Sequence, residues 1–539
     1  MARTDMFVIL LIAYAAGVAA AAASVEVDAQ GTAAAVRTPA ERERFSVATM
    51  NPSVVNARYA VRGALLARAM ALEKEGHAII RCNIGNPQAL GQHPISFARQ
   101  VLSLVLNPEL VDAMAGGPAA GGGSLADKRR AAAAKLLYPA DVVARAQAYL
   151  GAVPSVGAYS DSQGVPLVRR EVAAFIAARD GGHAASPDDV FLTDGASAGV
   201  KYWMQAAIRG PQDAVLVPIP QYPLYSAVTT LFNGTLAPYY LDEGAGWEVH
   251  LAELERALAA SRADGRNVRA LVVINPGNPT GQCLGEEAMR AIVAFCRREG
   301  LVLMADEVYQ ENIYRPDRQF TSFKKVLRDL EADEAEAAAG GGNLPPVPLV
   351  SFHSISKGFT GECGLRGGYF ETANVPEEIK AQILKIASVS LCSSVPGQLA
   401  VGLMVNPPRA GDASFAAYDG ERRAILDSLR RRATKLHAAL NRLEGVSCQP
   451  LQGAMYAFPS ITLPPKAIAA AAAAGVAPDF LYALRLLEEE HILVVPGSGF
   501  KQREHSWHFR TTFLPPEEQI DAVVEKLAAF HARFLEKYK

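Results

Sequence analysis

ALVVINPGNPTG at residues 270–281 joins a continuously apolar run to a stiff, turn-rich segment. The run is short and rich in valine and isoleucine, which is typical of a strand buried on both faces. Similar runs alternate with helical stretches between Ser155 and Ala400: VFLTD (190–194), AVLVPI (214–219), LVLMAD (301–306), LVSFHS (349–354) and LRGGYF (365–370). This alternation predicts βα units and a mainly parallel sheet between helices, which is an α/β fold.

A second, smaller α+β domain is expected around the sheet domain. Residues 422–443 and 517–538 have helical periodicity. In the later segment, apolar side chains form one stripe: Ile520, Val523, Val524, Leu527, Phe530 and Phe534. We expect residues 1–45 to lie outside the fold, 46–150 to form an N-terminal arm and part of the small domain, 151–418 the large domain, and 419–539 the C-terminal small domain.

Three stretches of biased composition are interpreted as surface insertions or loops. They are residues 113–134 (Gly/Ala-rich with KRR), 329–346 (acidic, then GGGNLPP) and 466–476 (mostly Ala). No residue expected to carry chemistry lies in them.

The composition bounds the function. The chain has 539 residues, half of them hydrophobic, and its 53 Lys and Arg nearly balance its 55 Asp and Glu. Such a balance gives no strong field for phosphate backbones, so nucleic acid is not an expected partner. The six cysteines are scattered without a CxxC pair, and we expect reduced, buried thiols and no metal site.

The N-terminal segment allows two interpretations. Residues 6–24 form one apolar run, which resembles a secretory signal or a membrane anchor. An organelle presequence competes with this: Arg37, Arg42 and Arg44 favour it, and the acidic residues around them oppose it. Membrane association is expected only if residues 6–24 are retained as an anchor.

The residues that directly follow the predicted strands are the candidates for chemistry, because ligands of open α/β sheets bind beyond the carboxyl ends of the strands. Residues 194–199 (DGASAG) form a small-residue turn opening a helix, which favours a phosphate. Residues 275–281, 306–309 (DEVY) and 354–359 (SISKGF) supply a turn, an acid and a lysine. Taken singly, each segment has an equally good structural interpretation. Residues 194–199 could serve tight packing, 275–281 could be a plain turn, Asp306 could cap a helix, and Lys357 could be a surface lysine.

Their joint order is more specific. DGAS, NPGNPTG, ADEVY, SISKGF, CGLRGGY and FRTTF, which span most of the chain from about Asn51, resemble the class I/II aminotransferases of the type I pyridoxal-phosphate fold. The resemblance implies that 151–418 is a cofactor-binding domain and that the cofactor is pyridoxal 5'-phosphate. It also implies ping-pong transamination between amino acids and 2-oxo acids.

The resemblance assigns roles around the cofactor ring. Lys357 would hold the cofactor as an aldimine and, once freed, move the substrate α-proton. Asp306 would stand beside the pyridine nitrogen and favour the protonated ring. Asn278 and Tyr309 would bond the phenolic oxygen, and Tyr222 would stack on the ring. Lys357, Asp306 and Tyr222 are therefore the expected catalytic residues.

A second group is expected at the cofactor phosphate. It consists of the backbone N–H groups of Ala196 and Ser197, the hydroxyls of Ser197, Ser354 and Ser356, and the Arg366 guanidinium. Tyr159 resembles the tyrosine that reaches the phosphate of a neighbouring subunit, which implies a homodimer.

The substrate end is expected at Arg510, whose planar guanidinium can grip a carboxylate through two parallel hydrogen bonds. Gly85 and Asn86 are expected to line the same pocket together with Asn278, and glycine there permits close approach of the backbone.

NIGNPQALGQHPISF, YSDSQG and QYPLYSA are most similar to the alanine aminotransferases and their glutamate–glyoxylate relatives. This implies L-alanine and 2-oxoglutarate, with glyoxylate or another amino acid as the alternative. A lyase or synthase on the same fold, a non-catalytic cofactor-binding regulator and a membrane-tethered protein stay open as well. The ending Glu-Lys-Tyr-Lys lacks a peroxisomal address, so cytosol or mitochondrion is expected.

Overall fold

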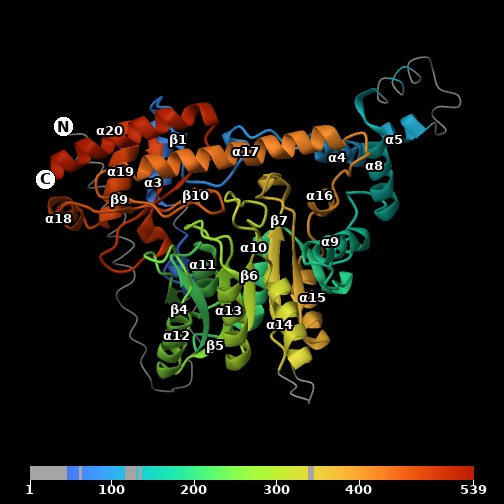
Figure 1. Ribbon diagram of the computed structural model, residues 1–539, viewed down its shortest axis with the longest axis horizontal. Coiled ribbons are helices and arrows are strands. Elements are labelled where there is room, and N and C mark those ends of the chain that lie inside the picture. Colours follow the sequence, from blue (N-terminus) through green and yellow to red (C-terminus); the bar gives the residue numbers. More distant parts are fainter. Residues whose placement is uncertain (1–44, 60–62, 116–128, 130–131, 133–135, 338–344) are drawn as a thin grey trace, which may run out of the picture.

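The computed structural model describes residues 45–59, 63–115, 129, 132, 136–337 and 345–539. Its centre is a seven-stranded sheet in the order β2-β8-β7-β6-β5-β3-β4 (Figure 1). The strands are β2 Val190–Thr193, β3 Asp213–Ile219, β4 Thr235–Tyr240, β5 Asn267–Ile274, β6 Val302–Asp306, β7 Leu349–Ser354 and β8 Gly368–Ala373. Only β8 runs antiparallel to its neighbours in this sheet, so the predicted α/β fold with a mainly parallel sheet is confirmed.

Helices cover both faces of the sheet. Alternate strand residues point to opposite faces, so Val215 and Val217 pack in a different cluster from Ala214 and Leu216. One face carries α10 Ala196–Ala207, α11 Leu224–Leu231 and α15 Glu377–Val389, and the other carries α12 Leu251–Ala263, α13 Glu286–Glu299 and α14 Phe323–Ala337. This double cover explains why the strand sequences are almost continuously apolar.

A third hydrophobic cluster packs against β2 and β8, at one edge of the sheet. It joins α4 Ser96–Leu106, α8 Ala140–Ala152, α9 Pro166–Arg179 and α16 Val395–Val405. Two short helices, α2 Pro52–Asn56 and α5 Pro108–Ala115, belong to the N-terminal region, and α2 packs against α11.

The second body combines segments from both ends of the described chain. Its short strands pair as β1-β12, β10-β14-β13 and β11-β9. The strands are β1 Ile80–Arg81, β9 Val446–Ser447, β10 Tyr456–Ala457, β11 Ser460–Ile461, β12 Ile492–Leu493, β13 Val495–Pro496 and β14 Phe509–Thr512. The helices are α3 Ala64–Lys74, α17 Phe415–Leu440, α18 Pro465–Ala473, α19 Pro478–Glu490 and α20 Ile520–Tyr538. The domain boundaries stay a prediction, and the segment 1–45 lies outside the described residues except for Phe45.

Several sequence expectations need correction. The interpretation of 329–346 and 466–476 as loops is wrong where α14 and α18 occupy them, because runs of alanine and glutamate favour helix. Most of 113–134 lies outside the described residues. The helix expected at 422–443 begins earlier, at Phe415, and ends at Leu440. The helix expected at 517–538 is confirmed as a short 3-10 turn followed by α20, with its apolar stripe packed inward.

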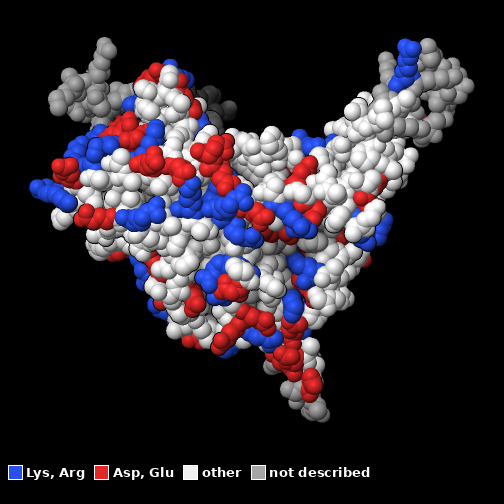
Figure 2. Space-filling model, turned by 45° about the horizontal axis from the view of Figure 1, so that its top comes forward, with Lys and Arg blue, Asp and Glu red and all other residues white. Residues whose placement is uncertain are grey.

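The surface mixes both signs of charge. Figure 2 shows basic and acidic side chains interspersed over the visible face. On α17, Arg430 pairs with Asp427, and Arg431 with Glu517. Within the described residues, no single helix is long and apolar enough to cross a membrane, although α18 and α19 pass that test together as a pair bent by 90°.

Candidate active site

A cavity of about 470 Å³ opens at the carboxyl ends of the central strands. Twelve of the residues singled out from the sequence line it: Gly85, Asn86, Ala196, Ser197, Tyr222, Asn278, Asp306, Tyr309, Ser354, Ser356, Lys357 and Arg366. They come from five strand ends and from the N-terminal region, so the fold brings together side chains up to about 280 positions apart in the sequence. Ligands of open α/β sheets bind at this edge.

The acid of the site is Asp306, the last residue of β6. Its side chain is 5% exposed, and Oδ2 accepts a 2.7 Å hydrogen bond from the Tyr225 hydroxyl. Burial raises the pKa of Asp306 to about 6, although the Tyr225 hydroxyl, the Val308 N–H and the charge of Lys357 act in the opposite direction. A cationic group bound beside Asp306 would stabilise the ionised carboxylate further.

The lysine of the site follows β7. Lys357 Nζ donates a 2.5 Å hydrogen bond to the Gly85 carbonyl and lies 5.9 Å from the centre of the Tyr309 ring. Tyr456 also lines the cavity, and its hydroxyl accepts a 3.4 Å hydrogen bond from that of Tyr309. Burial opposes ionisation of Tyr456, but Lys357 and Arg510 together bring its pKa below the usual value. An amine, a carboxylate and three phenols, with that of Tyr222 included, therefore face one cavity.

An anion cradle lies at the start of α10. Gly195 adopts φ +75 before the helix, and Ala196 and Ser197, which line the cavity, belong to the first turn, whose backbone N–H groups have no partner within a helix. The positive φ of Gly195 favours glycine, and a Cβ there would lie 2.6 Å from Arg366 Nη2 and displace that guanidinium. Arg366 is held by the carbonyls of Asp194 and Cys363, each at 2.8 Å. This cradle fits a phosphate group.

A buried arginine stands behind the other end of the cavity. Arg510 is 1% exposed, and it donates to Asn278 Oδ1 at 3.1 Å and to the Asn83 carbonyl at 2.6 Å. Its guanidinium carbon lies 4.0 Å from the centre of the Tyr456 ring and 4.7 Å from that of Phe500. Its Nε has no hydrogen-bond partner among the described residues. The two rings hold the guanidinium in place.

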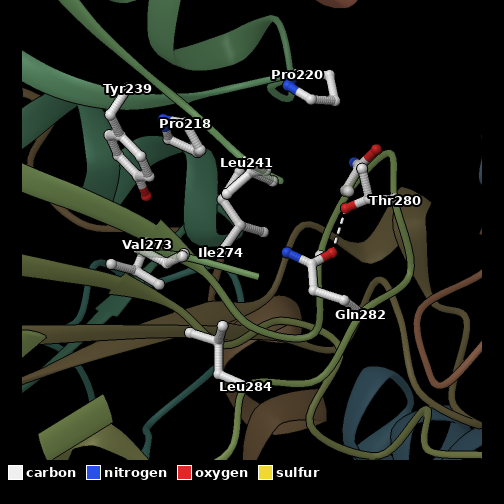
Figure 3. Close-up of a pocket in the computed structure, with 12 residues that line it drawn as sticks. Pro218, Pro220, Tyr239, Leu241, Val273, Ile274, Thr280, Gln282 and Leu284 are labelled. Carbon is white, nitrogen blue, oxygen red and sulfur yellow. Dashed lines mark hydrogen bonds between the residues drawn. The ribbon is translucent and has the colours of Figure 1, made fainter. Parts of the chain in front are cut away.

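The loop that carries Asn278 is fixed from behind. Figure 3 shows Thr280 and Gln282 pointing toward each other at a small second cavity, where Thr280 donates a hydrogen bond to Gln282. A Cβ on Gly277 would lie 1.9 Å from Gln282 Oε1, so a side chain there would displace the amide that bonds Thr280. The 275–281 segment thus forms a stiff loop that holds Asn278, which is 6% exposed, at the cavity.

Tyr159 lies apart from this group. Its side chain is 78% exposed and does not line the cavity of its own chain. Tyr456, Tyr225, Cys363 and Asn83 are not among the residues expected from the sequence. Tyr225 had a signal in QYPLY, because it follows Tyr222 by three positions at the start of a helix, and such residues share a face.

Comparisons with known proteins agree with this geometry. Residues 131–527 match the family model described as aminotransferase class I and II. A probable mitochondrial alanine aminotransferase of Dictyostelium discoideum is 48% identical over 513 residues, covering 92% of this chain and 91% of that protein. Glutamate–glyoxylate aminotransferase 2 of Arabidopsis thaliana is 48% identical over 491 residues, covering 91% and 96%.

The fold also has solved counterparts. The crystal structure of an aminotransferase from Escherichia coli superposes with a TM-score of 0.67 at 24% identity, covering 90% of this chain and 98% of that one. The predicted type I fold and the predicted transaminase class are confirmed. The chain belongs to the aminotransferase class I and II family.

Proposed function

We propose that this protein interconverts L-alanine and 2-oxoglutarate with pyruvate and L-glutamate, using pyridoxal 5'-phosphate. The observation that carries the proposal is the meeting of Lys357, Asp306 and the α10 cradle in one cavity, with Arg510 bonded to Asn278 directly behind its lining. The names of relatives favour alanine and also support the alternative of glutamate and glyoxylate.

The residues present fit the cofactor at both ends. The α10 N–H groups, Ser354, Ser356 and Arg366 would hold its phosphate, and Asp306 would face its pyridine nitrogen. Asn278 and Tyr309 would bond its phenolic oxygen, and Tyr222 would cover its ring. When bound, pyridoxal phosphate supplies an electron sink for the carbanion formed at the substrate α-carbon.

The chain's own groups would supply orientation and proton transfer. Arg510 would hold the substrate carboxylate, which fixes the α-carbon toward Lys357. Lys357 Nζ would take the α-proton, a task that contributes about 10²- to 10⁴-fold in rate. The Gly85 carbonyl accepts a hydrogen bond from that amine, so the amine lies beside a residue of the proposed substrate pocket. The ionised Asp306 carboxylate would favour protonation of the cofactor's pyridine nitrogen.

Tyr159 supports a homodimer. Because its exposed side chain does not line the cavity of its own chain, we infer that it reaches the phosphate site of a second copy. Amino acids and 2-oxo acids are the proposed small-molecule partners. The naming of one relative as mitochondrial is compatible with a mitochondrial location, and the apolar run 6–24 lies outside the described residues.

The test supplies purified protein with L-alanine and 2-oxoglutarate, then with L-glutamate and glyoxylate. The proposal predicts equimolar pyruvate and glutamate, parallel lines in a double-reciprocal plot, and a higher kcat/KM for the alanine pair. A higher kcat/KM for the glyoxylate pair would select the alternative. If neither pair exchanges its amino group, the proposed reaction is wrong.

A further inference from the structure

A short 3-10 turn, η5 Gly497–Phe500, connects the buried arginine to the cofactor side of the cavity. The Phe500 ring packs on the Arg510 guanidinium at 4.7 Å, in addition to the Tyr456 ring at 4.0 Å. The Phe500 carbonyl accepts a 2.9 Å hydrogen bond from the N–H of Gln221, the residue before Tyr222. A shift of η5 would therefore move the support of Arg510 and the segment that carries Tyr222.

A buried carboxylate holds η5 in place. Asp479, near the start of α19, is 0% exposed. Its Oδ2 accepts from the Ser498 N–H at 2.6 Å and from Gln502 Nε2 at 3.0 Å, and Oδ1 accepts from the Phe480 N–H at 3.0 Å. Two of these three donors belong to η5 or to the segment just after it. A buried carboxylate satisfied by neutral donors is costly to disturb, because each lost donor leaves it less solvated.

The donor and the acceptor of each hydrogen bond can be assigned from Asp479 through Gln502 to His508. A carboxylate only accepts, so the Gln502 amide nitrogen faces Asp479 and the Gln502 oxygen faces His508. His508 Nδ1, at 2.9 Å from that oxygen, is therefore the donor. His508 Nε2 lies 3.1 Å from Glu243 Oε2, which comes from the segment after β4. Asp479, Gln502 and His508 thus form one continuous hydrogen-bonded chain.

The surroundings leave this chain little freedom. His508 is 2% exposed, and its ring stacks on Phe458 at 4.7 Å with an interplanar angle of 2°. Phe458 in turn meets Phe500 edge to face at 5.7 Å. The Gly497 N–H donates to the His508 carbonyl at 2.8 Å, and a Cβ on Gly497 would lie 2.4 Å from the Gln502 oxygen. Packing this dense transmits a displacement and does not absorb it.

We propose that Asp479, Gln502 and His508 are positioning residues for Arg510: they fix η5 so that Phe500 supports the guanidinium, and they thereby set the affinity for substrate carboxylates. The inference rests on the proposed function of Arg510 as the carboxylate anchor. None of the three lines the cavity, so they act on the substrate through Phe500 and Arg510. Loss of the chain should weaken substrate binding more than it slows the chemical step.

The experiment uses the full-length, cofactor-loaded protein with His508→Leu and Gln502→Leu. Each should raise KM for both L-alanine and 2-oxoglutarate by about 5- to 30-fold, with kcat within about threefold of wild type. The dissociation constant of 2-methylalanine, which has no α-hydrogen and cannot turn over, should rise by the same factor when followed by the visible cofactor band. The band of the unliganded protein should stay unchanged.

Two variants control for packing. His508→Asn can still donate to Gln502 through its amide, so it should recover most of the affinity that His508→Leu loses. Glu243→Gln retains an amide that can bond His508 Nε2 while Nδ1 still donates to Gln502, so it should leave KM within twofold of wild type. If His508→Leu does not fold, Gln502→Leu decides. KM and 2-methylalanine affinity within twofold of wild type in Gln502→Leu, or no recovery in His508→Asn, would overturn the inference. Wild-type protein without transamination would instead reject the proposed function.

Discussion

The hydroxyl of Tyr225 donates a 2.7 Å hydrogen bond to Oδ2 of Asp306, and both side chains are buried. Burial, followed by the negative charge of Asp306, raises the pKa of Tyr225 well above its usual range, so the phenol remains a donor throughout the physiological pH range. This contact stabilises the ionised form of Asp306 inside an environment that otherwise favours the neutral acid.

Replacement of Tyr225 by phenylalanine should weaken cofactor binding. A hydrogen bond to a charged group contributes about 1.5 to 3 kcal/mol, so we expect the cofactor dissociation constant to rise by about 10- to 100-fold. Fluorescence titration of cofactor-free protein measures it. Tyr239→Phe is the matched control, because that buried hydroxyl donates to the Val272 carbonyl and not to Asp306. Equal effects of both substitutions would contradict the assigned role.

Asp306 should make the stability of the cofactor-free protein depend on pH. Its pKa in the folded chain, about 6, exceeds the usual 3.8, so between these values the folded state binds more protons than the unfolded state. Stability therefore falls as the pH rises from about 4 to 6, by about 3 kcal/mol from this residue. Urea unfolding of wild type and Asp306→Asn should show this difference in slope, and identical slopes would argue against a raised pKa.

Gly85 should not tolerate a side chain. A Cβ there would lie 2.0 Å from the Tyr456 hydroxyl oxygen and 2.9 Å from Lys357 Nζ. Gly85→Ala should therefore displace the amine and lower kcat by about 10²-fold, since small misplacements of a reacting group have effects of that size. Gly364→Ala is the control near the same cavity, because its Cβ would meet no atom within 4 Å. A wild-type kcat in Gly85→Ala would contradict the prediction that catalysis depends on the position of Lys357 Nζ beside Gly85.

The exposed Tyr159 gives a prediction for mixed dimers. Lys357→Ala homodimers should have little activity because they lack the reacting amine. Tyr159→Phe homodimers should have little activity when the cofactor is scarce. If Tyr159 serves the neighbouring site, a mixed dimer has one intact site, and each mixed dimer should regain roughly half the wild-type activity. Refolding the two variants together and assaying the product checks this. Activity no greater than the mean of the two parents would place Tyr159 outside the partner's site.

The sequence predicts the centre of the sheet well and its edge poorly. Strands β6 and β7 and the second half of β5 are buried between helices, so their sequences are mostly apolar. Strand β4 is missed because it pairs only with β3 at the sheet edge, contains Pro238 and is partly exposed, which is also typical of a loop. The strand expected in 365–370 begins only at Gly368, because Arg366 adopts φ +56 to reach the anion cradle.

The same contrast holds in the site. Lys357, Asp306 and Asn278 can be found because each lies in a short motif at the carboxyl end of a strand. Tyr456 cannot, because QGAMYAF has no motif and the side chain reaches the cavity through folding of a distant segment. Side chains that act by long-range packing, such as Phe500 against Arg510, carry no local signal.

Reduction with borohydride in the presence of pyridoxal 5'-phosphate, followed by peptide mapping, tests the central claim most directly. We predict one stable pyridoxyl group per chain, on the peptide containing Lys357, and none in Lys357→Ala. A label on another lysine, or an unlabelled wild-type chain, would contradict the assignment of this cavity as the cofactor site.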